Sequence, residues 1–148
     1  MRADKYLTFR LRDESYGVPV SKVREIVPMP AITPVPQSPP YVKGVFNLRS
    51  KAVPVVDLCA RFGATAPAYT DRTCIVVVDI DIASSRVAIG VAVDAVSEVL
   101  PILPVDISEL PGFGKVDASR GVVGVTTSRN GVTLLLDLDR LFGSARAG

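Results

Sequence analysis

The residue types that most often do chemistry are scarce in this chain and do not gather into a catalytic set. There is no histidine among the 148 residues, so the commonest general base and the commonest metal ligand are both missing. The two cysteines, Cys59 and Cys74, lie in Val/Leu-rich surroundings, which indicates reduced, buried thiols. They are too few for an ordinary four-ligand zinc site. The sequence therefore predicts no enzyme activity, no metal and no cofactor.

Polar side chains interrupt one apolar stretch, GVFNLRSKAVPVVDL at residues 44–58. Asn47 and Arg49 stand in its middle, and Asp57 stands near its end. A buried strand has little use for an asparagine and an arginine so close together. The simplest interpretation is a turn at 47–50 with Arg49 on its surface. A more specific role for Arg49 depends on the elements around it.

Those elements are strands, because the dominant period of the apolar residues is two. Leu7, Phe9 and Leu11 alternate with polar residues, and the pattern resumes at Tyr16 after the turn at 12–15. The segments 74–82 and 87–93 repeat this strand–turn–strand arrangement around Ser84-Ser85. Twelve prolines and eleven glycines interrupt the chain too often for long helices. We expect an all-β protein with a few short helices.

The two halves of the chain resemble each other. GVPVSKVREIVP from Gly17 matches GVAVDAVSEVLP from Gly90, and GVFNL from Gly44 matches GVVGV from Gly121. VVDLCARFG then matches LLDLDRLFG in the same order. In the last pair, Asp57 and Asp137 follow apolar strands and precede short helical segments, so we interpret both as helix N-caps rather than acids that act in catalysis.

The repeat predicts two like lobes. A unit of roughly 70 residues can barely bury its own core, whereas two packed together can. Small sheets usually close into barrels, because closure removes their edges. We expect one domain over residues 1–148 made of two five-stranded β-barrels side by side around a shared core, at approximately 14–70 and 71–143. The strand at 5–12 is compatible with pairing in either lobe. The alternative is a single β-sandwich.

Charge and hydropathy exclude several partners. Seventeen basic residues are interleaved with fifteen acidic ones, so the sequence predicts no nucleic-acid surface. No apolar run approaches 18 residues, so no membrane insertion is expected. The N-terminal stretch MRADKYLTFRLRDE is charged throughout and has no apolar signal region, which predicts a cytoplasmic protein.

Several segments together resemble the family of CheW, the chemotaxis coupling protein, over nearly the whole chain. They are YGVPV at 16–20, VREI at 23–26, GVFNLR at 44–49, PVVDL at 54–58 and VAVDAVSEV at 91–99. The resemblance implies two SH3-like barrels, in agreement with the repeat. It also implies a non-enzymatic adaptor that couples the histidine kinase CheA to the cytoplasmic tips of methyl-accepting chemoreceptors. Such an adaptor is recruited to receptor arrays at the inner face of the membrane.

The resemblance also suggests roles for particular residues. It places Glu25 and Arg49 close together, and we expect a structural ion pair between them that fixes the 47–49 turn. Kinase binding is expected at Val23, flanked by Lys22 and Arg24. One departure from the family is Ser50, where glycine is usual, and serine fits most turn positions except those with positive φ.

The receptor tip is expected to lie as a helix in a groove between the lobes. Gly44 would allow close approach of that helix, because glycine has no side chain. The residues expected along this groove are Val20, Gly44, Val45, Asn47, Leu48, Val91 and Val93.

Other functions remain as alternatives. One is an adaptor of the same type in a non-flagellar pathway such as pilus motility. A more remote one is a small barrel that binds nucleic acid, and the least favoured is an enzyme. Retention on heparin at moderate salt would favour nucleic acid, whereas co-elution with a CheA regulatory domain would favour the adaptor.

Overall fold

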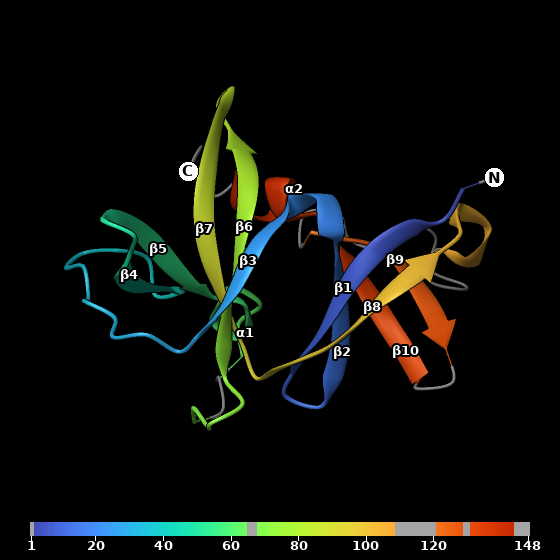
Figure 1. Ribbon diagram of the computed structural model, residues 1–148, viewed down its shortest axis with the longest axis horizontal. Coiled ribbons are helices and arrows are strands. Elements are labelled where there is room, and N and C mark those ends of the chain that lie inside the picture. The colour runs from blue at the N-terminus through green and yellow to red at the C-terminus, as the bar shows by residue number, and fades with distance from the viewer. Residues whose placement is uncertain (1, 65–67, 109–120, 129–130, 144–148) are drawn as a thin grey trace.

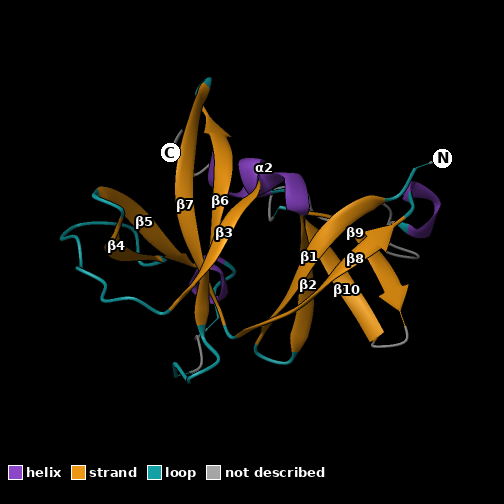
Figure 2. Cartoon of the chain, viewed as in Figure 1, coloured by secondary structure: helices purple, strands orange, loops and turns teal. Residues whose placement is uncertain are grey.

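The computed structural model describes residues 2–64, 68–108, 121–128 and 131–143, and its strands form two five-stranded sheets that lie side by side as two lobes (Figures 1 and 2). The first sheet has the order β8–β1–β2–β10–β9. Its strands are β1 Asp4–Leu11, β2 Glu14–Pro19, β8 Ala95–Ile102, β9 Val122–Ser128 and β10 Gly131–Leu136.

The second sheet has the order β3–β6–β7–β5–β4. Its strands are β3 Val23–Pro28, β4 Val42–Leu48, β5 Lys51–Asp57, β6 Cys74–Ile82 and β7 Ser85–Val93. The described helices are short: η1 Val20–Lys22, α1 Leu58–Arg61, η2 Pro104–Asp106 and α2 Leu138–Gly143. The prediction of an all-β fold with two five-stranded lobes is confirmed.

The two helices that follow strands begin as the sequence predicts. The Asp57 side chain accepts a hydrogen bond from the Ala60 N–H at 3.3 Å, and the Asp137 side chain accepts one from the Arg140 N–H at 3.2 Å. Each carboxylate satisfies a backbone donor that would otherwise lack a partner in the first helical turn. Both aspartates are therefore helix N-caps, which is a structural role.

The sheets do not follow the two halves of the chain. The first hairpin, β1–β2, belongs to the sheet that holds β8, β9 and β10, while β3, β4 and β5 join β6 and β7. The expected lobes at 14–70 and 71–143 are therefore wrong, because each lobe contains strands from both halves. The parallel pairs β2–β10 and β5–β7 join the exchanged segments. The strand expected at 5–12 lies between β2 and β8, so it pairs with both halves.

The internal repeat is visible in the strand order and in the register. Replacing each strand by its repeat partner, β1 by β6 and so on to β5 by β10, turns one sheet order into the other. Gly17 pairs with Leu135 across a parallel ladder, and Gly90 pairs with Val55 in the same way. These two glycines therefore occupy equivalent places, as the repeat requires.

One part of the predicted alignment is displaced by three residues. Gly44 pairs with Val55, and the residue that pairs with Leu135 is Gly124. The next residues, Val45 and Val125, each bridge to a single residue outside the strands. Gly44 therefore corresponds to Gly124 rather than to Gly121. The strand pairing fixes this register, whereas a shared Gly-Val dipeptide in the sequence does not.

Most of the core is shared between the lobes. Phe9 and Val18 of the first sheet belong to one cluster with Val78 and Val91 of the second. Leu141 of α2 is fully buried in the same cluster. A smaller cluster around Phe46, Val53 and Ile75 fills the far side of the second sheet. The lobes are thus held together by a continuous apolar core, as expected.

Candidate functional site

The turn between β4 and β5 explains the asparagine in the apolar stretch. Arg49 and Ser50 form a two-residue hairpin turn, and both have positive φ, 50° and 70°. This is the backbone of a type I′ turn, whose twist matches that of the flanking strands. The Asn47 side chain accepts a hydrogen bond from the Ser50 N–H at 2.8 Å. Asn47 therefore holds the turn closed.

The turn directs Arg49 toward Glu25 of β3. Arg49 Nη1 donates to Glu25 Oε2 at 3.2 Å, and Nη2 donates to Oε1, so the contact is bidentate. The hydrogen bond from Arg49 lowers the pKa of Glu25, and the same bond raises the pKa of Arg49. The expected ion pair is thus present.

This ion pair joins the two edges of one sheet. β3 and β4 are the outer strands of the second sheet, yet Glu25 lies on β3 and Arg49 directly follows β4. The sheet must therefore curve until its edges approach each other. Because an exposed ion pair adds little stability, its main effect is on geometry. It fixes the β4–β5 turn beside the exposed edge of β3.

Apolar residues with some exposure lie on both of these outer strands. Ile26 of β3 is 44% exposed, whereas Val27, the next residue, and Leu48 of β4 pack partly against the smaller core cluster. On β4, a shallow hollow begins at the same turn; its lining is Thr33, Val45, Phe46, Asn47, Ser50, Lys51 and Ala52. The Glu25–Arg49 pair is adjacent in sequence to both features. We call Ile26, Val45 and Leu48, with this pair, the β3–β4 edge surface.

Lys22, one of the residues expected to bind the kinase, is held in place by ion pairs within the chain. Lys22 Nζ donates to Asp139 Oδ2 of α2 at 2.8 Å and lies 3.6 Å from an oxygen of Asp81. The hydrogen bond to Asp139 is the main reason that the pKa of Lys22 is raised. Lys22 therefore anchors α2 to the start of β3.

The neighbours of Lys22 differ in exposure. Arg24 is exposed and forms an ion pair with Asp79 of β6 at 2.8 Å. Val23 pairs with Val78 and packs against the main core, so a charge introduced at Val23 would disturb the fold as well as the surface.

Three of the residues expected to line a groove between the lobes are buried. Val91 and Val93 are 2% and 1% exposed and belong to the shared core, so they cannot line an open groove. Gly44 is buried, and a Cβ there would lie 2.2 Å from the Thr33 carbonyl oxygen. Because Gly44 has no side chain, the backbone of Thr33 in the same chain can lie against it, and this backbone takes the place expected for a partner helix.

The remaining four groove residues are not all alike. Val20 lies in η1 and packs partly against the main core. Val45 and Leu48 are partly exposed, and Asn47 is exposed. The last three belong to the β4–β5 hairpin and line or border the β3–β4 edge surface.

Sequence reasoning missed the exposure of Ile26. Its repeat partner, Val99 of β8, is also exposed, at 50%. Both residues follow the paired glutamates of the repeat, Glu25 and Glu98, on outer strands of their sheets. Two apolar residues at one repeat position, each beside a charge, are the signal that could have identified them.

The described residues contain no group of three or more His, Cys, Asp or Glu side chains that could hold a metal ion. Among the helices that the structure describes, none combines the length and the apolar character needed to cross a membrane.

Comparison with known proteins adds a family to this geometry. The family model of the CheW-like domain matches residues 5–146. This chain belongs to the CheW-like domain family. The protein named Chemotaxis protein CheW of Rhizobium meliloti (strain 1021) is 36% identical over 138 residues, which cover 93% of this chain and 86% of the relative. The protein of the same name from Klebsiella aerogenes is 31% identical over 140 residues, covering 95% and 82%.

A solved structure of a CheW protein has the same fold. It is the crystal structure of scaffolding protein TtCheW from Thermoanaerobacter tengcongensis, with a TM-score of 0.80 and 32% sequence identity. The match covers 95% of this chain and 92% of that one. The resemblance to CheW seen in the sequence motifs is confirmed.

Proposed function

We propose that this CheW-like chain is a non-enzymatic adaptor in a chemotaxis pathway. It binds the regulatory domain of a CheA-type histidine kinase and the cytoplasmic tip of a methyl-accepting chemoreceptor. It works in the cytoplasm, at receptor arrays on the inner face of the membrane. The observation that carries this proposal is the family match over residues 5–146, together with relatives named for chemotaxis and one named a scaffolding protein.

The kinase is proposed to bind along β3. Ile26 supplies the exposed apolar contact, Val23 packs against the main core at the start of the strand, and Arg24 lies at the rim. Lys22 has a different role in this proposal: its contacts with Asp139 and Asp81 set the position of the strand. A partner of the same two-sheet architecture could place an outer strand against β3, and such an interface needs roughly 1,000 Å².

The test of the kinase surface is co-elution of the full chain with a CheA regulatory domain. Ile26→Asp is expected to abolish co-elution and to leave the melting temperature nearly unchanged, because the side chain is already 44% exposed. Val99→Asp is the matched control, since Val99 holds the same repeat position on the other sheet. If only Val99→Asp abolishes co-elution, the kinase binds the first sheet and the assignment to β3 fails.

The receptor tip is proposed to contact the β4–β5 hairpin through Val45, Asn47 and Leu48. A helix is held in an apolar groove by side chains spaced three and four residues apart. Asn47 and the Glu25–Arg49 pair keep the hairpin in the shape that such a helix requires.

Binding to a receptor signalling fragment tests this surface. Val45→Glu is expected to weaken receptor binding far more than kinase binding. Val125→Glu is the control, because Val125 has the equivalent strand position and similar partial exposure. Equal effects of the two variants on receptor binding would contradict the assignment.

A further inference from the structure

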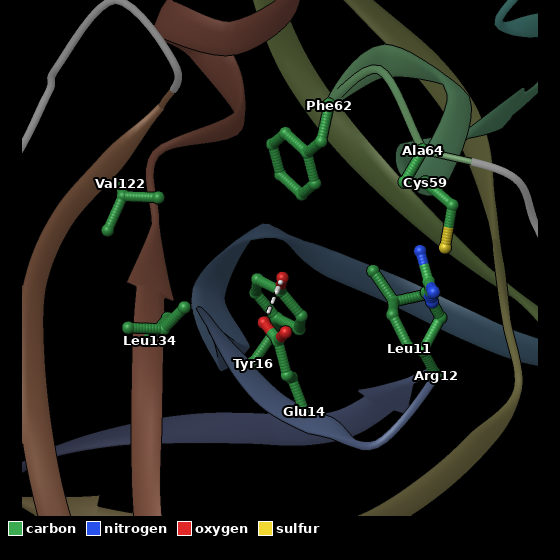
Figure 3. A pocket seen from close by; sticks show the side chains of 9 residues that line it. All are labelled: Leu11, Arg12, Glu14, Tyr16, Cys59, Phe62, Ala64, Val122 and Leu134. Carbon is green, nitrogen blue, oxygen red and sulfur yellow. Dashed lines mark hydrogen bonds between the residues drawn. The ribbon is translucent and has the colours of Figure 1, made fainter.

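A cavity of about 280 Å³ opens at one end of the first sheet, under the segment that follows β5. Figure 3 shows the Phe62 ring above the Tyr16 ring, with Val122 and Leu134 on one side and Leu11, Arg12 and Cys59 on the other. The residues that line it are Leu11, Arg12, Glu14, Tyr16, Cys59, Phe62, Ala64, Val122 and Leu134. It lies away from the β3–β4 edge surface and shares no residue with it.

The cavity exists because the two repeats differ at this place. In β1–β2, three residue pairs lie between Thr8–Gly17 and the turn, whereas in β6–β7 five pairs lie between Val77–Gly90 and the turn. The longer hairpin of the second sheet reaches α2, where the backbone N–H of Asp81 donates to the Asp139 side chain. The shorter hairpin of the first sheet leaves the corresponding space open.

The helices differ as well. Where α2 has the fully buried Leu141, α1 has Arg61, and Arg61 points away to donate to the Leu141 carbonyl oxygen at 3.2 Å. The first sheet thus lacks the long hairpin that reaches the helix in the second, and Arg61 takes no part in the lining of the cavity. The shorter hairpin leaves room for a small molecule.

The interior suits an apolar or aromatic body. Leu11, Val122 and Leu134 form aliphatic walls, and Phe62 stacks on Tyr16 with ring centres 5.9 Å apart. The Tyr16 hydroxyl donates to Glu14 Oε2 at 3.0 Å. Burial and this hydrogen bond raise the pKa of Tyr16, so the ring stays neutral.

The rim carries one cation and one anion. Arg12 lies in the β1–β2 turn, Glu14 is the first residue of β2, and both are exposed. Within the described chain, the Arg12 guanidinium makes no hydrogen bond or ion pair, although its backbone N–H is fixed by Asp94 Oδ2 at 2.6 Å. Figure 3 shows this guanidinium beside the Cys59 sulfur and the Glu14 carboxylate beside the Tyr16 hydroxyl. This guanidinium, unpaired among the described residues, therefore faces the cavity from a backbone that holds its position.

We propose that this cavity binds a free amino acid with an apolar or aromatic side chain. Arg12 holds the α-carboxylate, Glu14 holds the α-ammonium group, and the side chain enters the space between Phe62 and Leu134. A ligand with only a negative charge would be repelled by Glu14, and a ligand with only a positive charge would be repelled by Arg12. A zwitterion satisfies both, and pockets of this kind are apolar with a few polar groups that fix orientation.

The test is calorimetric titration of the full chain with L-phenylalanine, L-leucine, 3-phenylpropionate and phenethylamine. Binding of the amino acids is expected in the millimolar range or tighter, with each single-charge analogue weaker by about tenfold, since one charge-assisted contact is lost. No heat from the amino acids up to about 10 mM would overturn the proposal. So would equal affinity for an amino acid and its single-charge analogues.

Variants locate the site. Arg12→Gln and Ala64→Leu are expected to lower the affinity for phenylalanine by at least about tenfold, the first by removing a charged contact and the second by filling the cavity. Arg86→Gln is the matched control, because Arg86 is an exposed arginine beside the corresponding turn of the second sheet. Binding that survives both Arg12→Gln and Ala64→Leu would place the ligand elsewhere and refute this site.

Discussion

Ser50→Gly is expected to stabilise the protein. Ser50 has a φ of 70°, in the left-handed region, where a side chain other than that of glycine costs roughly 1–2 kcal/mol. Glycine removes this strain but gives up about 0.5–1 kcal/mol through the greater freedom of the unfolded chain. The Ser50 backbone N–H donates to Asn47, and glycine keeps that donor. The net gain is about 0.5–1 kcal/mol, or about 1–4 °C in melting temperature for a chain of this size.

The assay is thermal and urea denaturation of the wild type and three variants. Ser84→Gly should gain as much as Ser50→Gly, since Ser84 has a φ of 67° and takes the same place in the β6–β7 turn. Ser85→Gly is the negative control: it lies in β7, so it should lose about 0.5–1 kcal/mol. The reasoning would be refuted if Ser50→Gly lowered stability as Ser85→Gly does.

Three further outcomes are expected. Lys22→Ala and Asp139→Ala should each lower the free energy of unfolding, measured by urea denaturation, by about 1–2 kcal/mol. The double variant should lose clearly less than the sum of the two single losses. Full additivity would mean that the two residues are not coupled. Gly44→Ala should lower the free energy of unfolding by about 3 kcal/mol or more, because the added Cβ meets backbone at 2.2 Å. Gly63→Ala should lower it by only about 1 kcal/mol, because nothing lies within 4 Å of the added Cβ. Similar losses in denaturation would contradict this difference. The pKa of the Cys59 thiol is raised to about 11, chiefly by burial, so the thiol stays protonated at neutral pH. Its alkylation, followed by mass spectrometry, should be very slow at pH 7.5 and should accelerate as the pH approaches 11. Rapid modification at neutral pH would count against this environment.

The strands and the repeat could be predicted because their signals are local. Alternation at 7–11 and 74–82 reports one face of a strand directly, and an aspartate between an apolar strand and a short helical segment reports a cap. The partner of each strand is not a local property. Nothing in the letters of β1–β2 says that this hairpin joins β10 rather than β5, since the two repeats offer equivalent edges. The exchange therefore appears only in the pairing itself.

The candidate site was predictable to a similar extent. Glu25, Asn47 and Arg49 are polar residues in apolar surroundings, and such residues stand out in a sequence. The valines do not, because Val91 and Val45 have the same chemistry and differ only in which face of a curved sheet they occupy. Gly44 was recognised as a point of close approach, but whether the approaching group is a partner or the chain itself depends on the path of residues 29–41.

The exchanged hairpins bear on the origin of the molecule. Neither repeat can complete a five-stranded sheet of this order alone, because each gives its first hairpin to the other. Two separate copies of one ancestral unit could form every pairing seen here by swapping that hairpin between subunits. The present chain has the topology of a hairpin-swapped homodimer whose two subunits are joined end to end. Once joined, the two copies were free to diverge, and a difference of two residue pairs between their hairpins is enough to leave an open cavity in one sheet and a closed wall in the other.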